Sequence, residues 1–170
     1  MASLLLYFFS MKQGLFLLSF LLLFSSSGFA KLPACMDKKD RLEFNENKVL
    51  VWRDHLDKKE TARAFIKGII VRIMEDRQKH VHFEVDFDKD LSTKDDRIEV
   101  IYNTKFGPLP ENRPGDEIVA CGDFVADPYS PFKGVVHWLH MSPKKSAHDD
   151  GYLAINGIVT GLVNPKPENK

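Results

Sequence analysis

The stretch Val81–Phe87, VHFEVDF, determines the predicted fold class. Its apolar residues alternate strictly with polar ones: Val81, Phe83, Val85 and Phe87 against His82, Glu84 and Asp86. Strict alternation is typical of a half-buried β-strand, because successive side chains of a strand point to opposite faces of the sheet. We therefore predict a strand here, with its apolar residues facing a core.

Apolar runs rich in β-branched residues predict the other strands of a sheet, Ala64–Met74, Arg97–Asn103, Glu117–Ala126 and Gly134–His140. Gly68 and Gly122 lie inside the two longest, where glycine indicates a bend or bulge. Asn156-Gly157, between the apolar runs of Tyr152–Thr160, predicts a hairpin. Five bent strands and no convincing helix predict an all-β fold, a small OB-type barrel with an added C-terminal hairpin. An SH3-like barrel or an open sandwich fits nearly as well.

The barrel domain is expected to span residues 64–163, with its five strands over 64–140. The alternation of each strand predicts which side chains are inside: Val81, Phe83, Val85, Ile98, Val100, Ile118 and Phe124. A charge-dense leader, 31–63, precedes the barrel and contains a possible strand or docking segment, Val49–Trp52. A polar tail, 164–170, follows it.

Residues 1–30 are predicted to be a secretory signal peptide. Lys12 precedes an apolar run, Leu15–Phe24, and Gly28 and Ala30 supply the small residues at positions −3 and −1 of a cleavage site after Ala30. Cleavage would make the protein periplasmic or secreted, with no transmembrane segment after processing.

Two alternatives to cleavage and one question about the start remain open. A retained membrane anchor is disfavoured by Lys12, which would lie in the middle of the span. Lipid attachment at Cys35 is a second alternative, since Leu32-Pro33-Ala34-Cys35 loosely resembles a lipobox. The apolar block before Met11 leaves open whether Met1 or Met11 is the true start.

Charge and composition exclude some classes of protein. Twenty-four basic and twenty-four acidic residues give a formal net charge of zero, unlike the cationic surface of a dedicated nucleic-acid binder. A hydrophobic content of 44% is too high for a disordered chain. The charge balance therefore argues against single-stranded nucleic-acid binding, which OB folds often perform.

The chain has two cysteines, Cys35 and Cys121. In an oxidising compartment they have one possible pairing, a disulfide that closes a long loop. The alternative is a buried Cys121 and an unpaired Cys35 in the leader. There is no C-x-x-C sequence, so neither thiol-redox catalysis nor a zinc ribbon is supported.

Histidines supply the candidate site. Of six, one is in the leader, and five lie at the predicted strand ends or in the following loop: His80, His82, His137, His140 and His148. Asp149 and Asp150 come directly after the last. Imidazoles and carboxylates ligate divalent transition metals, so we expect His80, His137, His140 and His148, with Asp149 or Asp150, to be neighbours at one rim of the barrel. Trp138 is expected to point into the core.

The segments that carry this pattern are GIIVRIMEDRQKHVHF, IEVIYNTKFGPLP, PGDEIVACGDFV, GVVHWLH and HDDGYLAING. From Gly68 to Gly157 the chain resembles a bacterial domain family of unknown function with a hallmark H-W-T-H motif. The resemblance implies a small exported or membrane-associated domain, and matches His80, His137-Trp138, His140, His148 and Gly151 to that family's pattern. Leu139 replaces the threonine, and Tyr152 stands in place of an expected tryptophan.

The sequence thus favours an exported β-barrel module that binds a small ligand or a metal at a His-rich rim, with His80, His137, Trp138, His140 and His148 in the ligand site. The loop aromatics Tyr129 and Phe132 are expected to line the same rim. One alternative is a metal-assisted hydrolase with His140 or His148 as general base, although no hydrolase motif is present. The other is a structural or interaction protein whose partner is in the cell envelope.

Overall fold

The computed structural model describes residues 31–55, 61–75, 78–144 and 148–163. The predicted signal peptide, 1–30, and the predicted tail, 164–170, lie outside the described residues. In the described part of the chain, no helix is both long enough and apolar enough to span a membrane.

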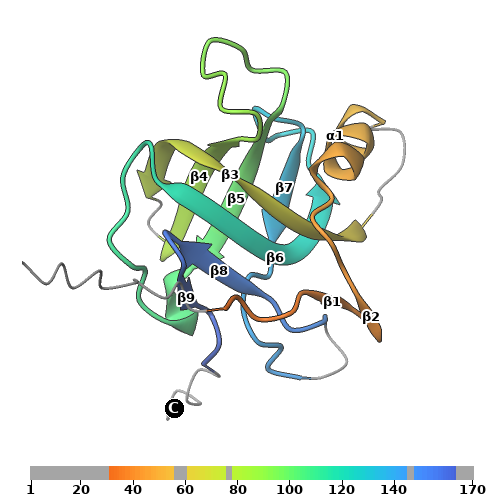
Figure 1. Ribbon diagram of the computed structural model, residues 1–170, viewed down its shortest axis with the longest axis vertical. Helices are drawn as coiled ribbons and strands as arrows, with labels where there is room; N and C mark the ends of the chain where they lie inside the picture. Colours follow the sequence, from red (N-terminus) through yellow and green to blue (C-terminus); the bar gives the residue numbers. More distant parts are fainter. Residues whose placement is uncertain (1–30, 56–60, 76–77, 145–147, 164–170) are drawn as a thin grey trace, which may run out of the picture.

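Five strands form a closed ring in the order β3 (Thr61–Glu75), β4 (His80–Asp86), β5 (Arg97–Asn103), β7 (Gly134–His137) and β6 (Glu117–Ala126), with β6 pairing back to β3 (Figure 1). All neighbours are antiparallel except β5 and β7, which are parallel. The predicted all-β fold, an OB-type five-stranded barrel, is confirmed. A register shift between Ile70 and Arg72 forms an irregularity in β3 shortly after Gly68, where the sequence indicated a bend.

The C-terminal hairpin is also confirmed and lies outside the ring. Its strands are β8 (Tyr152–Ile155), which pairs with β6, and β9 (Ile158–Thr160). Asn156 and Gly157 have φ angles of 49° and 80°, the left-handed pair that a two-residue type I′ turn requires.

The barrel interior is a single apolar cluster. All seven side chains predicted to be inside belong to it, and each is at most 5% exposed: Val81, Phe83, Val85, Ile98, Val100, Ile118 and Phe124. The strict alternation of β4 therefore predicted its register correctly, because a slip of one residue would have turned the whole apolar set outward.

Part of the outward face of β4 and β5 is buried as well, and this part is charged. Arg97 is 4% exposed and donates from Nη1 to Glu84 Oε1 at 2.6 Å and from Nε to Asp86 Oδ2 at 3.3 Å. Burial opposes the charge on the guanidinium, but the two carboxylates outweigh burial and raise the Arg97 pKa. Arg97 thus forms ion pairs with two buried acids on the outside of the barrel.

The leader is folded onto the barrel. It contains a two-residue ladder, β1 (Met36–Asp37) with β2 (Asp40–Arg41), and then a helix, α1 (Glu46–Asp54). The expectation that the chain contains no helix was therefore wrong. The helix was missed because its apolar residues, Val49–Trp52, are consecutive and lack the helical period.

The start of α1 protects an open edge of the sheet. β4 pairs with β3 only from Ile69 onward, so the first part of β3 has no strand on that side. Phe65 N donates to Asn45 Oδ1 at 2.8 Å and Lys67 N donates to Glu46 Oε1 at 2.8 Å. Side chains of the leader therefore satisfy backbone groups that an unpaired edge would expose.

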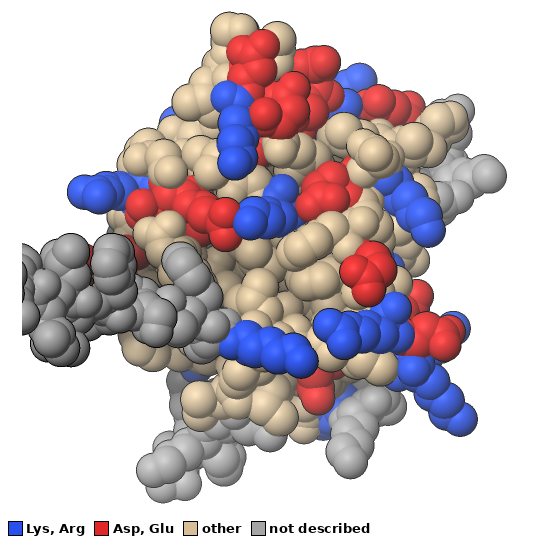
Figure 2. Space-filling view, viewed as in Figure 1, with Lys and Arg blue, Asp and Glu red and all other residues tan. Residues whose placement is uncertain are grey.

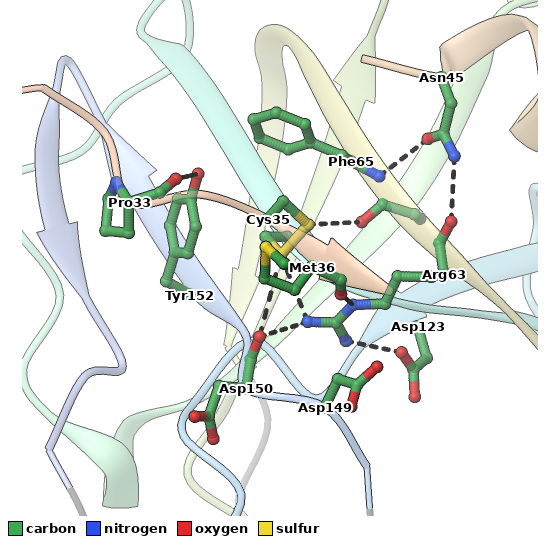
Figure 3. The surroundings of a disulfide bond; sticks show 12 residues. Pro33, Cys35, Met36, Asn45, Arg63, Phe65, Asp123, Asp149, Asp150 and Tyr152 are labelled. Carbon is green, nitrogen blue, oxygen red and sulfur yellow. Dashed lines mark hydrogen bonds and ion pairs between the residues drawn. A yellow bond between two sulfur atoms is a disulfide. The ribbon is translucent and has the colours of Figure 1, made fainter. Parts of the chain in front are cut away.

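A disulfide joins Cys35, in the leader, to Cys121 on β6, with a Cα–Cα distance of 5.6 Å (Figure 3). The Arg63 guanidinium lies beside it and donates to Cys121 Sγ at 3.3 Å, to Asp123 Oδ1 at 2.6 Å and to the carbonyl of Asp150. Arg63 also donates to the Met36 carbonyl at 2.9 Å. The disulfide and this arginine fasten the leader to the barrel.

Candidate functional site

The start of β4 and the end of β7 meet at one end of the barrel. β5 is antiparallel to β4 and parallel to β7, so β7 runs opposite to β4. Residues at the beginning of one therefore lie near residues at the end of the other. This topology brings His80 and His137 together, with ring centroids 5.9 Å apart.

A continuous chain of ring contacts covers this end of the barrel, and we call it the histidine cluster. Its centroid distances are 6.5 Å for His80–His82, 5.9 Å for His80–His137, 5.1 Å for His137–Trp138, 6.1 Å for Trp138–His148 and 4.8 Å for His140–His148. Phe106 extends the chain by stacking on His140 at 3.3 Å. The four histidines expected to be neighbours lie in this chain, together with His82.

Trp138 does not point into the core, contrary to the expectation from the sequence. β7 ends at His137, and Trp138 has a φ of 55°, which interrupts the alternation of the strand. The core position is taken by Leu139, which is 1% exposed, while Trp138 is half-buried between two histidines. This early end of the strand is what allows His137 and His140 to lie on one side of the molecule.

Backbone hydrogen bonds define the tautomers of His140 and His148. His140 Nδ1 lies 2.8 Å from the Met141 carbonyl, and His148 Nδ1 lies 2.8 Å from the Asp149 carbonyl. A carbonyl oxygen only accepts, so each Nδ1 carries the proton and each Nε2 carries the lone pair. Metal-binding histidines commonly have such a partner, which orients the ring and raises its basicity.

His82 and His80 are oriented by side chains instead. His82 Nδ1 is 2.6 Å from Glu99 Oε1, and Ser130 Oγ donates to the other oxygen of that buried carboxylate. His80 Nε2 accepts from Asn103 Nδ2 at 3.2 Å. These contacts connect the histidine cluster to the buried polar face of β4 and β5.

Of the two aspartates after His148, neither places its carboxylate among the imidazoles through a hydrogen bond. Asp149 Oδ2 accepts from Lys38 N of the leader at 2.6 Å, and Asp150 Oδ1 accepts from Ser142 N at 2.8 Å. Asp150 is nevertheless close enough to favour the charged form of His140. The loop aromatics do not line this site, because Tyr129 is 95% exposed and Phe132 lines a pocket with Arg53.

The pKa values of two histidines in the cluster are depressed. Burial, followed by the charges of His80, His140, His82 and His148, lowers the pKa of His137 from 6.5 to about 4. Burial also lowers the pKa of His140, against the opposing effect of the Met141 carbonyl. Imidazoles that resist protonation retain their lone pairs, which are the electrons that a metal ion needs.

This depressed pKa predicts that acid destabilises the metal-free protein. The unfolded chain binds a proton at His137 near pH 6.5 and the folded chain binds it only near pH 4, so stability is lost as the pH falls through that window. Allowing for solvent screening of a half-buried ring, we expect a loss of about 1–2 kcal/mol relative to His137→Gln. Urea unfolding in EDTA at several pH values measures it, and parallel pH profiles for both proteins would contradict it.

The imidazoles are not preassembled as a set of three. Among the residues that the structure describes, one group of at least three possible ligand atoms lies mutually within 4.8 Å, and it is Asp86, Asp88 and Asp96 rather than the histidines. These acids are not among the site residues predicted from the sequence, although Asp86-x-Asp88 at the end of one predicted strand and Asp96 just before the next indicate a shared hairpin. Among the contacts between two histidines of the cluster, the shortest is His140–His148.

Comparison of the sequence with known protein families found no family that matches, and comparison with curated proteins found no match.

Proposed function

We propose that this protein is an exported small β-barrel module that binds a divalent transition metal at the histidine cluster. The observation that carries the proposal is the pair His140–His148, whose ring centroids are 4.8 Å apart and whose Nε2 atoms both carry lone pairs. Two imidazoles that each place a nitrogen about 2.0–2.1 Å from one ion have centroids roughly 4.5–6.5 Å apart. The pair thus has the separation of two ligands on one ion.

The surroundings of this pair support the proposal. Phe106 stacks on His140 and Trp138 stacks on His148, so both rings are held by aromatic neighbours. His137 contacts Trp138, which in turn stacks on His148, and we take His137 as the candidate third ligand. Imidazole nitrogens favour zinc, copper and nickel over calcium and magnesium.

Export is part of the same proposal. It is supported by the signal-like sequence of residues 1–30 and by the disulfide, which persists best in an oxidising compartment. We also propose that the chain is related to the H-W-T-H family. In support, the residues that match the family's motif, His137, Trp138 and His140, all lie in the histidine cluster.

Calorimetric titration of the untagged chain with Zn²⁺, Ni²⁺ and Cu²⁺ tests the proposal. We expect His148→Gln to weaken zinc affinity about tenfold or more, because a two- or three-ligand site loses one ligand. His148 is the sharper target, since His140 is 5% exposed and its replacement also removes packing against Phe106.

His55→Gln is the matched control for this titration. His55 also has its Nδ1 2.6 Å from a backbone carbonyl, that of Val51, but it is exposed at the end of α1. We expect its replacement to leave zinc affinity unchanged. Equal losses in the two variants, or no heat from any of the three ions with the unmodified chain, would contradict the proposal.

A further inference from the structure

The loop between β4 and β5 lies at the barrel end opposite the histidine cluster and carries a group of acids. Asp86 ends β4, Asp88 follows in the loop and Asp96 precedes β5, and one carboxylate oxygen from each lies within 4.8 Å of the others. In the space-filling view, acidic side chains gather over this loop at the top of the molecule (Figure 2).

Backbone amides hold these carboxylates close together despite their repulsion. Asp96 Oδ2 accepts from Phe87 N at 3.0 Å and from Asp88 N at 2.6 Å. Asp86 Oδ1 accepts from Lys89 N at 2.8 Å. The acids are therefore positioned by the hairpin itself.

The second carboxylate oxygen of Asp96, Oδ1, has no hydrogen-bond partner in the described part of the protein. Asp96 is 8% exposed, and its Oδ1 is buried without a hydrogen-bond partner, alone in this respect among the side-chain nitrogens and oxygens of the described ranges. A buried carboxylate oxygen without a partner loses its hydration and gains nothing in return. A bound cation would supply the missing partner.

The local charge also points to a cation. Arg97 Nε lies 3.3 Å from Asp86 Oδ2, but the same guanidinium is shared with Glu84 at 2.6 Å. Arg72 also pairs with Glu84 at 3.1 Å, so the charge of Arg97 balances at most Asp86, and among the described residues neither Asp88 nor Asp96 forms an ion pair. The group has more negative charge than its protein partners neutralise.

We propose that Asp86, Asp88 and Asp96 bind a calcium ion. Calcium takes oxygen ligands at about 2.3–2.6 Å, so two ligand oxygens on one ion lie at most about 5 Å apart, as they do here. Acids at alternate positions, Asp86, Asp88 and Asp90, resemble the first ligands of calcium loops, although Leu91 stands where those loops have glycine. Magnesium suits this irregular site less well, because it requires a near-ideal octahedron.

A bound ion would also fix the loop against the leader. Arg53 of α1 donates to the Asp95 carbonyl at 2.6 Å and to the Arg97 carbonyl at 3.0 Å, on either side of Asp96. Ordering Asp96 therefore orders the backbone on which α1 docks. This site is separate from the histidine cluster, and its existence does not depend on the function proposed above.

Thermal unfolding and calorimetry of the EDTA-treated full chain with Ca²⁺ test this site. We expect the Tm to rise by about 3–5 °C when calcium is roughly ten times the dissociation constant. Asp96→Asn should abolish the rise, because the amide retains an oxygen for the two backbone amides but removes the ligand charge. Without calcium, that variant should be at least as stable as the unmodified chain, since one repelling charge is gone.

Three further variants of the chain serve as controls. Asp88→Asn, at an exposed position, should also lose the calcium response if Asp96→Asn fails to fold. Asp127→Asn should keep it, because Asp127 likewise accepts a backbone amide, that of Tyr129, but lies outside the group. His148→Gln should keep it as well. No response of the unmodified chain up to about 10 mM calcium, or an undiminished response in the folded Asp88 or Asp96 variants, would overturn the assignment.

Discussion

Removing the disulfide by Cys35→Ala with Cys121→Ala is expected to lower the free energy of unfolding by about 4 kcal/mol. The bond joins residues separated by 86 positions, so it restricts a long loop of the unfolded chain. The loss should exceed that of most single substitutions, because Cys35 also holds the leader that covers the open edge of β3. Guanidinium unfolding of the variant and of the reduced parent chain measures it.

The double variant provides its own control for the effect of the reductant. Dithiothreitol should shift the unfolding midpoint of the parent chain toward that of the variant and leave the variant unchanged. Hydrogen exchange should show faster exchange at Phe65 and Lys67, whose amides bind Asn45 and Glu46 of the leader. Equal midpoints for the variant and the oxidised parent would show that the bond does not stabilise this fold.

Replacing Arg97 by Met is expected to cost about 3–5 kcal/mol, because the change leaves Asp86 charged and buried without its ion-pair partner and leaves Glu84 with the exposed Arg72 alone. Their side chains are 7% and 0% exposed, and Arg97 supplies a hydrogen bond to each. Methionine has a similar stem and fills much of the space, so most of the loss should come from the orphaned charges rather than from packing. Equilibrium unfolding in urea gives the difference.

Arg72→Met is the matched control for Arg97→Met. Arg72 Nε lies 3.1 Å from Glu84 Oε2, the other oxygen of the same carboxylate, but its side chain is 56% exposed. Its removal should cost less than about 1 kcal/mol, since exposed ion pairs contribute little. Similar costs for the two variants would mean that burial of Arg97 is not the cause of its effect.

Local sequence patterns predicted the barrel because its strands have strong period-two or turn signals. Alternation in Val81–Phe87 gave the register of β4, and Asn156-Gly157 gave the hairpin, since the conformation of each follows from neighbouring residues alone. The burial of Glu84 and Asp86 was not predictable in that way. Those acids look like a solvent-facing row in the sequence, and only the tertiary fold buries them beside Arg97.

The sequence predicted which histidines lie close together, but not the backbone conformation that arranges them. The antiparallel relation of β4 and β7 follows from the expected topology, which is why His80 and His137 were expected to meet. The left-handed conformation of Trp138 was not predictable, because tryptophan has no preference for it. Because of that conformation, Leu139 occupies the core position expected for Trp138, and the Trp138 indole lies among the rings of the histidine cluster.

Imidazole ¹⁵N resonances during a zinc titration test the central claim most directly, namely that His140 and His148 share a metal ion. The untagged chain retains His55 as an internal reference outside the histidine cluster. We predict that the Nε2 resonances of His140 and His148 shift at stoichiometric zinc, while their Nδ1 atoms remain protonated and both His55 nitrogens stay unchanged. Zinc that perturbs His55 alone, or that leaves the Nε2 resonances of His140 and His148 unmoved, would contradict the account.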